Sequence, residues 1–393
     1  MNRRHAFAFA KAPIPALASL MLLGSPLAAA TPDAWIERHR QPLDPAGPIA
    51  MPAVFRGAQV MLLGEVHGLR HGQWLDLAML KAVHAEAGVR RYIGEFDGAQ
   101  ADAFNQALDT ADTSALDAVF AGWRLRGLQW ANADFRAKLD QIITWNRGLP
   151  TNRRIRFVGA DEVQDQAGYC RWLAPRLGAL PALLARLADP AQCPAALADA
   201  GGVSAPAGID PVTSDALAAL AVEGQTRDRE ARIAANIRRH LQRDGGPVYG
   251  LWGLGHVVKA PVNKGAPMAL VLAQQGVTVR SLAMLNINGT MMIPTAAAGG
   301  GIAWTGMAYS MDSDALVQVN GIDAFARRTQ GPLTLFTLRG KATPFRHSDS
   351  LTRAGGRLAA LQPFTIDASA AIDGLWADGV ILSVGSPATR PLG

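Results

Sequence analysis

The sequence predicts an α/β fold: a central, mostly parallel sheet flanked by helices, with helical insertions. Short apolar and β-branched runs alternate along the chain with longer stretches of helical period, and this alternation is typical of parallel α/β sheets. The 393 residues are 49% hydrophobic and 18% charged. A chain of this length and composition can bury a large core, and we find no internal repeat that would divide it.

Residues 1–30 have the composition of a secretory signal peptide. Arg3 and Arg4 supply positive charge, 15–27 is largely apolar, and three alanines occupy 28–30. These are the three parts of a cleavable export signal. We therefore expect a periplasmic or secreted protein whose remaining residues, 31–393, form one α/β domain with no segment that stays in the membrane.

The elements of the domain follow from local periodicity and from the residues that interrupt it. Seven short apolar runs are predicted as strands: 59–63, 91–94, 155–158, 248–252, 277–282, 333–338 and 380–384. Six segments of helical period lie between or beside them: 71–86, 99–108, 133–146, 166–177, 229–241 and 268–275. Two Pro-, Gly- and Ala-rich stretches are predicted as excursions: 190–211, a loop or lid insertion, and 294–301.

The charge balance does not favour a nucleic-acid-binding function. The chain has 38 basic and 32 acidic residues, but three of the basic ones lie in the acid-free leader. The remaining 35 basic and 32 acidic residues give a net charge of only +3, and no basic stripe is interleaved with aromatic residues. A small-molecule substrate is the partner that we expect.

The chain contains two cysteines, Cys170 and Cys193. In an oxidising compartment a pair of this kind usually forms a bridge, whereas two buried thiols would be the alternative. Because the leader predicts export, we expect a disulfide.

Titratable residues follow four of the predicted strands, and each time a glycine precedes the titratable residue by one or two positions. Gly64 precedes Glu65, with His67 two residues later, and the other three sites are Glu95, Asp161 and His256. The carboxyl ends of parallel strands lie on one edge of a sheet, where ligands bind. We therefore expect these side chains to share one crevice.

Such a cluster has more than one chemical use. A histidine near neutral pKa can take a proton from water while carboxylates orient it. The same residues could instead bind a divalent metal through Glu65, His67, Glu95 and His256. In the structural alternative, the carboxylates cap helices and form ion pairs, as Asp97 before Gly98 is expected to do.

The helix predicted at 229–241 adds an arginine to the site. Arg229, Ile233 and Asn236 share one face at spacings of four and three, and apolar residues continue that face. An arginine on a core-facing side needs an anionic partner, either a site carboxylate or a developing oxyanion of the substrate. His71, which opens the helix after the first motif, is a further residue that can reach the site.

Together these motifs resemble the erythromycin-esterase-like superfamily, which also includes ChaN-type haem-binding lipoproteins and the more distant Tiki and TraB proteins. The resemblance extends from about residue 60 to 392 and rests on the order and spacing of the motifs: 64–68 (Gly-Glu-Val-His-Gly), Gly94-Glu95, 142–147, 156–161, 229–236, Gly255-His256, and the tail at 372–375 and 387–392.

The esterase branch implies hydrolysis of a lactone or ester without a metal. Carried over by position, His67 is the general base, and Glu65 and Glu95 are its orienting carboxylates. Arg229 and His256 polarise the carbonyl. Asp161, His71 and Asn236 are expected to contact the substrate.

Two departures from the esterases leave alternatives open. One residue, rather than two, separates Glu65 from His67, which is more like the ChaN branch, and Asp76 stands where the esterases have an arginine. A haem- or metal-binding uptake protein and a metal-dependent hydrolase or peptidase are the rival predictions. ChaN-type proteins bind haem through tyrosine, and four tyrosines are available here: Tyr92, Tyr169, Tyr249 and Tyr309.

Overall fold

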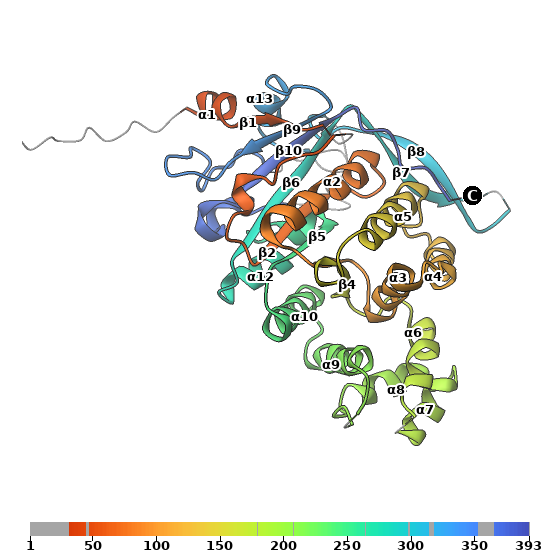
Figure 1. The fold of residues 1–393 in the computed structure, drawn as a ribbon. Coiled ribbons are helices and arrows are strands. Elements are labelled where there is room, and N and C mark those ends of the chain that lie inside the picture. Colours follow the sequence, from red (N-terminus) through yellow and green to blue (C-terminus); the bar gives the residue numbers. More distant parts are fainter. Residues whose placement is uncertain are drawn as a thin grey trace, which may run out of the picture.

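The computed structural model describes residues 31–44, 47–178, 180–206, 208–263, 265–297, 299–313, 318–352 and 365–392. Its centre is an eight-stranded sheet with the strand order β1-β9-β10-β6-β2-β5-β3-β4 (Figure 1). Six neighbouring strands, from β10 to β4, are parallel, and β9 and β1 complete the sheet in antiparallel pairing. The predicted α/β fold with a mostly parallel sheet is confirmed.

All seven predicted strands form, within two residues at most boundaries. They are β2 (Val60–Glu65), β3 (Arg91–Gly94), β4 (Arg156–Gly159), β5 (Val248–Gly253), β6 (Val279–Ile287), β9 (Leu333–Thr337) and β10 (Gly379–Val384). The structure adds the three-residue edge strand β1 (Arg40–Pro42), which has too few residues to show a period.

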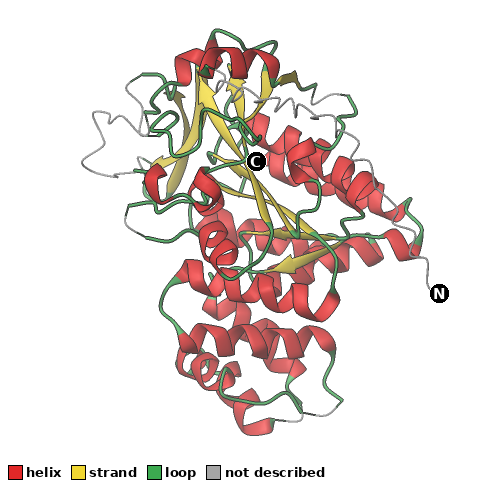
Figure 2. Ribbon diagram, turned by 90° about the vertical axis from the view of Figure 1, so that its left-hand side faces the viewer, coloured by secondary structure: helices red, strands yellow, loops and turns green. Residues whose placement is uncertain are grey.

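Helices cover both faces of the sheet (Figure 2). On one face lie α2 (Arg70–Ala87), α3 (Gly98–Thr110), α4 (Ser114–Leu125) and α5 (Ala133–Arg147), and their apolar residues share a core with Met61 and Leu63 of β2. On the other face lie α10 (Arg229–Asp244), the short α11 (Leu254–Val257), α12 (Met268–Gln274) and α13 (Ile322–Ala326), in a core with Val60 and Leu62. The alternation along β2 is the two-residue period of a strand buried on both faces.

The capping prediction for Asp97 is also confirmed. Its side chain accepts from the backbone N–H of Gln100, and the Gln100 side chain accepts in return from the backbone N–H of Asp97. This reciprocal capping box fixes the start of α3 directly after the end of β3. The short helix α1 (Pro32–Arg38) precedes the sheet.

The chain between β4 and α10 forms a helical unit with its own apolar core. It consists of α6 (Gln166–Leu173), α7 (Pro181–Ala188), α8 (Cys193–Ala200) and α9 (Pro211–Gln225), seen at the bottom of Figure 1. The stretch predicted as a loop or lid insertion, 190–211, therefore contains a helix rather than only loop. Its alanines and leucine bury one side of α8 against α7 and α9, a tertiary contact that local composition does not reveal.

Cys170 and Cys193 form the expected disulfide, which joins α6 to the start of α8. The second predicted excursion, 294–301, belongs to an antiparallel hairpin of β7 (Gly289–Ala296) and β8 (Ile302–Tyr309), so the prediction missed both strands. No helix among the described residues is long and apolar enough to cross a membrane. The predicted signal peptide, 1–30, lies outside the described residues.

Candidate active site

The carboxyl ends of four adjacent strands, β2, β5, β3 and β4, bring the predicted residues together. Glu65 ends β2, His67 follows it, Glu95 follows β3, Asp161 follows β4, and His256 lies on α11 after β5. These side chains, together with Arg229, are linked by hydrogen bonds and ion pairs of at most 3.7 Å. The sequence-based expectation that they share one site agrees with this geometry.

Glu65 and His67 form the first carboxylate–histidine pair. Nδ1 of His67 lies 3.1 Å from Oε1 of Glu65, and Gln73 Nε2 donates to both oxygens of that carboxylate at 3.1 and 3.0 Å. Glu65 is buried, whereas the His67 side chain is 25% exposed. Because Glu65 holds Nδ1, the Nε2 nitrogen is left to face the crevice.

Glu95 stands between two histidines. Its Oε1 lies 3.7 Å from Nε2 of His67, and its Oε2 lies 3.7 Å from Nε2 of His256. The backbone N–H of Gly253, at the end of β5, also donates to Glu95. The buried carboxylate is therefore fixed by the neighbouring strand and by both rings.

His256 has its own carboxylate partner, Glu230 of α10. Nδ1 of His256 lies 2.8 and 2.9 Å from the two oxygens of Glu230. The site thus contains two carboxylate–histidine pairs whose Nε2 atoms both face Glu95. Glu230 was not predicted as a site residue. It directly follows Arg229 in the helical motif, and this adjacency could have indicated that it lies at the site.

Arg229 completes the cluster and is held by Asp161. The guanidinium donates to both carboxylate oxygens of Asp161, at 2.9 and 2.6 Å, and lies 3.6 Å from Glu95. NH1 also approaches Nε2 of His256 at 3.4 Å. A bidentate pair of this kind fixes the plane of the guanidinium and leaves its remaining N–H groups for the crevice.

The charges of the cluster shift the pKa values of its members. Burial lowers the pKa of the His67 imidazolium, but Glu95 and Glu65 more than offset this, so the pKa lies above its ordinary value. The pKa of His256 is raised for the same reasons, burial being outweighed by Glu95 and Glu230. Burial raises the pKa of Glu65. Burial opposes ionisation of Glu95 too, but the two histidines, the Gly253 N–H and Arg229 prevail and lower its pKa.

Glycine makes room for this arrangement at two positions. A Cβ on Gly253 would lie 3.0 Å from Nε2 of His67 and 3.1 Å from Oε1 of Glu95. One on Gly72, in the first turn of α2, would approach the carboxylate of Glu65 even more closely. Any side chain at these positions would displace the catalytic candidates.

The three residues expected to contact substrate lie in different environments. Asp161 is occupied by Arg229 and therefore positions that arginine. Asn236 is fully buried and donates to the carbonyl of Ala160, so it holds the backbone just after β4. His71 is 5% exposed and bonds Ser383 Oγ through Nδ1, away from the cluster. The structure thus brings neither Asn236 nor His71 to the crevice, because the helix register turns both into the core.

Three observations bear on the metal- and haem-binding alternatives. Among the described residues, no group of three or more His, Cys, Asp and Glu side chains converges as a metal site would require. Arg229 already occupies Asp161 and approaches Glu95, and its charge opposes a cation there. All four tyrosines are at most 3% exposed, so none is available at the surface to bind haem iron.

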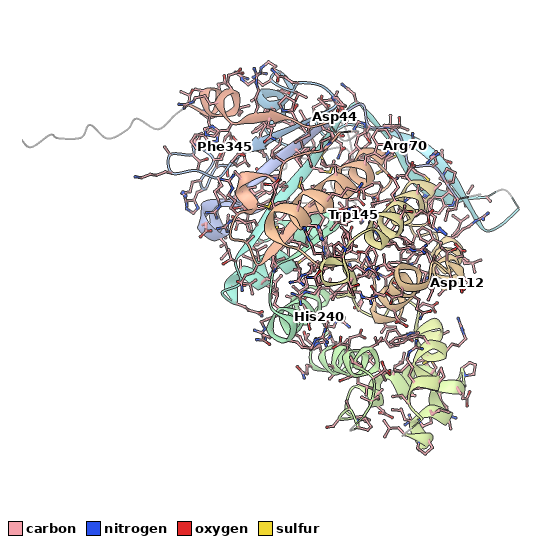
Figure 3. The ribbon with its side chains drawn as sticks, in the orientation of Figure 1. Asp44, Arg70, Asp112, Trp145, His240 and Phe345 are labelled. Atoms are coloured by element: carbon pink, nitrogen blue, oxygen red, sulfur yellow. A yellow bond between two sulfur atoms is a disulfide. The ribbon has the colours of Figure 1, made fainter. Side chains whose placement is uncertain are left out.

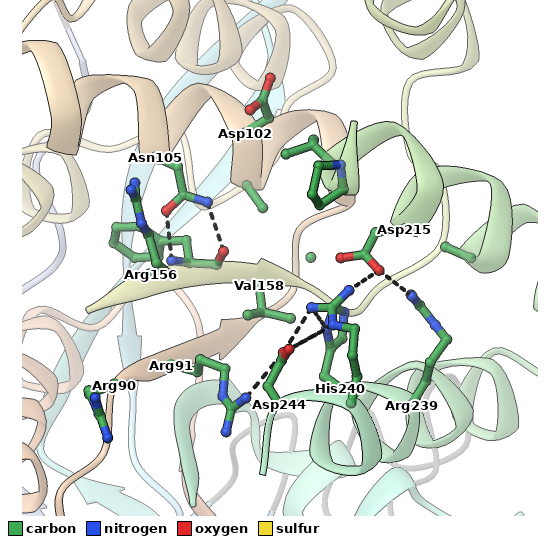
Figure 4. A pocket seen from close by; sticks show the side chains of 18 of the residues that line it. Arg90, Arg91, Asp102, Asn105, Arg156, Val158, Asp215, Arg239, His240 and Asp244 are labelled. Carbon is green, nitrogen blue, oxygen red and sulfur yellow. Dashed lines mark hydrogen bonds and ion pairs between the residues drawn. The ribbon is translucent and has the colours of Figure 1, made fainter. Parts of the chain in front are cut away.

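A large cavity lies elsewhere, along the free edge of β4 between α3, α9 and the end of α10 (Figure 4). It measures about 810 Å³. Asn105 blocks the strand edge there, accepting from the N–H and donating to the carbonyl of Phe157, both at 2.9 Å. Four arginines that line the cavity form ion pairs with aspartates: Arg91 with Asp244, Arg156 with Asp109, and Arg239 and Arg243 with Asp215. None of the predicted site residues lines it.

No protein-family model matches the chain, and no curated protein matches it by sequence. Solved structures do match. A Bacillus cereus protein shares 15% identity over 92% of this chain and 98% of its own, with a TM-score of 0.66. A succinoglycan biosynthesis protein shares 13% identity over the same fractions, with a TM-score of 0.68. A variant of the erythromycin esterase EreC in its open conformation shares 14% identity over 86% of this chain and 93% of its own, with a TM-score of 0.56. The chain therefore has the fold of erythromycin esterase, as its motifs predicted.

Proposed function

We propose that this protein is a hydrolase that cleaves an ester or lactone bond with a water activated by His67. The observation that carries the proposal is the pair of carboxylate–histidine units facing Glu95, one of which has a partly exposed imidazole. A histidine whose Nδ1 is held by a carboxylate presents Nε2 as a base toward bound substrate.

In the proposed reaction, the water oxygen attacks the carbonyl carbon while one water proton passes to Nε2 of His67. The negative charge that develops on the carbonyl oxygen is stabilised by Arg229 and by protonated His256. The carbon–oxygen bond to the leaving group then breaks, and His67 returns its proton to the departing oxygen. The products are a carboxylic acid and an alcohol, which remain in one molecule when the substrate is a lactone.

The carboxylates have separate tasks in this scheme. Glu65 holds the Nδ1–H of His67 and stabilises the imidazolium that forms. Glu95, between the rings, keeps both imidazoles in place and favours their charged forms. Glu230 does for His256 what Glu65 does for His67. The shared fold with an erythromycin esterase supports this class of reaction, although the 14% identity does not carry over its substrate.

The proposal includes metal-independent turnover and export. Because Arg229 lies within the carboxylate cluster, water activation rests on His67 rather than on a Lewis acid. The apolar leader and the Cys170–Cys193 disulfide support a periplasmic or secreted location. Export is tested by expressing the full-length chain and sequencing the N-terminus of the form recovered outside the cytoplasm.

The test is a panel of esters and lactones, macrolides included, assayed with the oxidised protein with and without a chelator. His67→Ala is the diagnostic variant, and His39→Ala is its matched control because His39 stacks on Trp35, outside the cluster. Turnover that survives the chelator, persists in the control and vanishes in His67→Ala supports the hydrolase. Turnover that the chelator abolishes would refute the metal-independent mechanism.

A further inference from the structure

A small cavity lies beside His67, within the candidate active site. It measures about 20 Å³ and is lined by Glu65, His67, Gln73, Glu95, Trp130 and Lys138, among others. This volume is enough for one water molecule, provided that polar groups are present to hold it. The ring of Trp130 lies 5.0 Å from that of His67.

One lining group is a buried acceptor that no described residue satisfies. Gln73 is 5% exposed, and its Nε2 donates to both oxygens of Glu65. The carboxylate needs a donor, which fixes the orientation of the amide and makes its other atom the acceptor. That acceptor, Oε1, is buried and has no hydrogen-bond partner among the described residues. An acceptor of this kind is normally satisfied by an ordered water.

A second lining group has donors to spare. Lys138 of α5 is 2% exposed, and its Nζ donates to Oδ2 of Asp76 at 2.6 Å. The ammonium has three N–H groups, and this is the one hydrogen bond that Nζ makes to a described residue. Asp76 is in turn well supplied with donors, because it also accepts from the hydroxyls of Tyr92 and Tyr249 at 2.7 and 2.8 Å. Asp76 therefore fixes the ammonium in place without using up its donors.

We propose that this cavity binds the hydrolytic water and that Lys138 and Gln73 hold it against Nε2 of His67. The water accepts from Lys138 Nζ and donates to Gln73 Oε1 and to His67 Nε2. One lone pair then remains for attack on the substrate carbonyl. The inference rests on the proposed hydrolase function, to which it adds the water site and two residues.

Lys138 has a chemical effect in this position as well as a geometric one. A hydrogen bond from an ammonium group stabilises the hydroxide that forms as His67 removes the proton. The proton passes from the water to Nε2, and no other reactant is needed. The charged groups facing His67 in this environment are Glu65, Glu95 and Arg229, and Lys138 faces the same cavity from α5.

The water site is tested by a high-resolution crystal structure of the wild-type protein. We expect a single ordered water within hydrogen-bond distance of Gln73 Oε1 and Lys138 Nζ. A cavity without density, or a water bonded to neither group, would overturn the inference. This measurement does not depend on turnover, so it separates failure of the water site from failure of the proposed function.

The role of Lys138 is tested with the double variant Lys138→Met and Asp76→Asn, which removes the donor without leaving a buried charge. We expect kcat to fall at least about tenfold with KM little changed. The NMR resonance of His67 Nε2 should also move, because the water bound to this nitrogen loses its donor. The matched control is Lys259→Met with Asp378→Asn, a second buried ion pair, of 2.8 Å, outside the cavity.

The two double variants together decide between a reaction-specific and a merely structural role. We expect the control to keep its kcat and its His67 resonance even if it is less stable. Equal losses of kcat in both variants, or an unchanged His67 Nε2 resonance in the Lys138 variant, would refute the role of Lys138. If no ester or lactone is turned over, the resonance and the crystallographic water still decide whether Lys138 and Gln73 bind a water beside His67.

Discussion

Removing Lys138 alone should destabilise the fold by leaving Asp76 charged and unpaired in the core. Asp76 is fully buried, and the Lys138 side chain is 3% exposed at 2.6 Å from it. Breaking a buried pair by removing one partner costs about 3 to 5 kcal/mol. Two tyrosine hydroxyls continue to donate to Asp76, so we expect Lys138→Met to lie at the lower end, about 3 kcal/mol.

Urea unfolding followed by tryptophan fluorescence compares the single variant with the double variant Lys138→Met plus Asp76→Asn. The double variant removes both charges and should recover most of the loss, to within about 1 kcal/mol of wild type. A single variant that loses less than about 1 kcal/mol would refute the assignment of a buried charge to Asp76. A double variant that is as unstable as the single one would refute it equally.

Four further predictions follow from the site and its surroundings. Because the His67 pKa lies above its ordinary value of about 6.5, the acid limb of the kcat/KM pH profile should have its midpoint above pH 6.5; a midpoint below that would contradict the assigned base. Glu230→Gln should lower kcat by about tenfold to a hundredfold in steady-state kinetics, since His256 loses its carboxylate. Replacing Cys170 and Cys193 by serine should destabilise the helical unit by about 3 kcal/mol in denaturant unfolding, because the bridge closes a loop with a sequence separation of 23. Burial and the neighbouring arginines lower the pKa of His240 on α10 (Figure 3) to about 4, so the folded protein should lose up to about 3 kcal/mol as pH falls from 6.5 to 4. His240→Gln should flatten that dependence in urea unfolding measured across this range.

In the proposed mechanism, two carboxylate–histidine pairs share one glutamate. Each pair alone would be an imidazole whose Nδ1 is held by one carboxylate, with no second carboxylate near Nε2. Because Glu95 lies 3.7 Å from both Nε2 atoms, protonation of either ring is favoured by the same carboxylate. One ring can therefore act as the base while the other stays protonated to face the developing oxyanion, which is the division of labour that the proposed mechanism uses.

The fold was predictable because its signals are local. The seven strands that the apolar runs predicted all form. Six of them, from β9 to β3 in the sheet order, have a neighbouring strand on each side and read as largely apolar segments. The hairpin of β7 and β8 was missed because its outer positions are exposed and its turn is rich in small residues. Helices α4, α7, α8 and α9 were not predicted, and α7, α8 and α9 bury their apolar sides mainly against one another and α6.

The candidate site was predictable where a titratable residue directly follows a strand. A glycine and then a titratable residue at a strand end is a pattern within a few positions, and parallel topology sends all such ends to one edge. The role of Asn236 was assigned from its helix face and the motif it belongs to, and that of His71 from its place at the start of a helix. Neither signal says which residues the side chain meets in the folded chain. Both side chains turned out to bond the core, to Ala160 and Ser383.

Local order and the rules of parallel topology were thus sufficient to predict the α/β sheet and the gathering of Glu65, His67, Glu95, Asp161 and His256. The disulfide was predicted from the leader and the number of cysteines. Which charged groups pair with one another became visible only in the folded chain. Glu230 meets His256 across 26 residues and Lys138 meets Asp76 across 62. Lys138 and Asp76 meet where α5 packs against α2, and Glu230 of α10 reaches His256 of α11. Each buried charge needs a partner, and no local pattern encodes which one it finds.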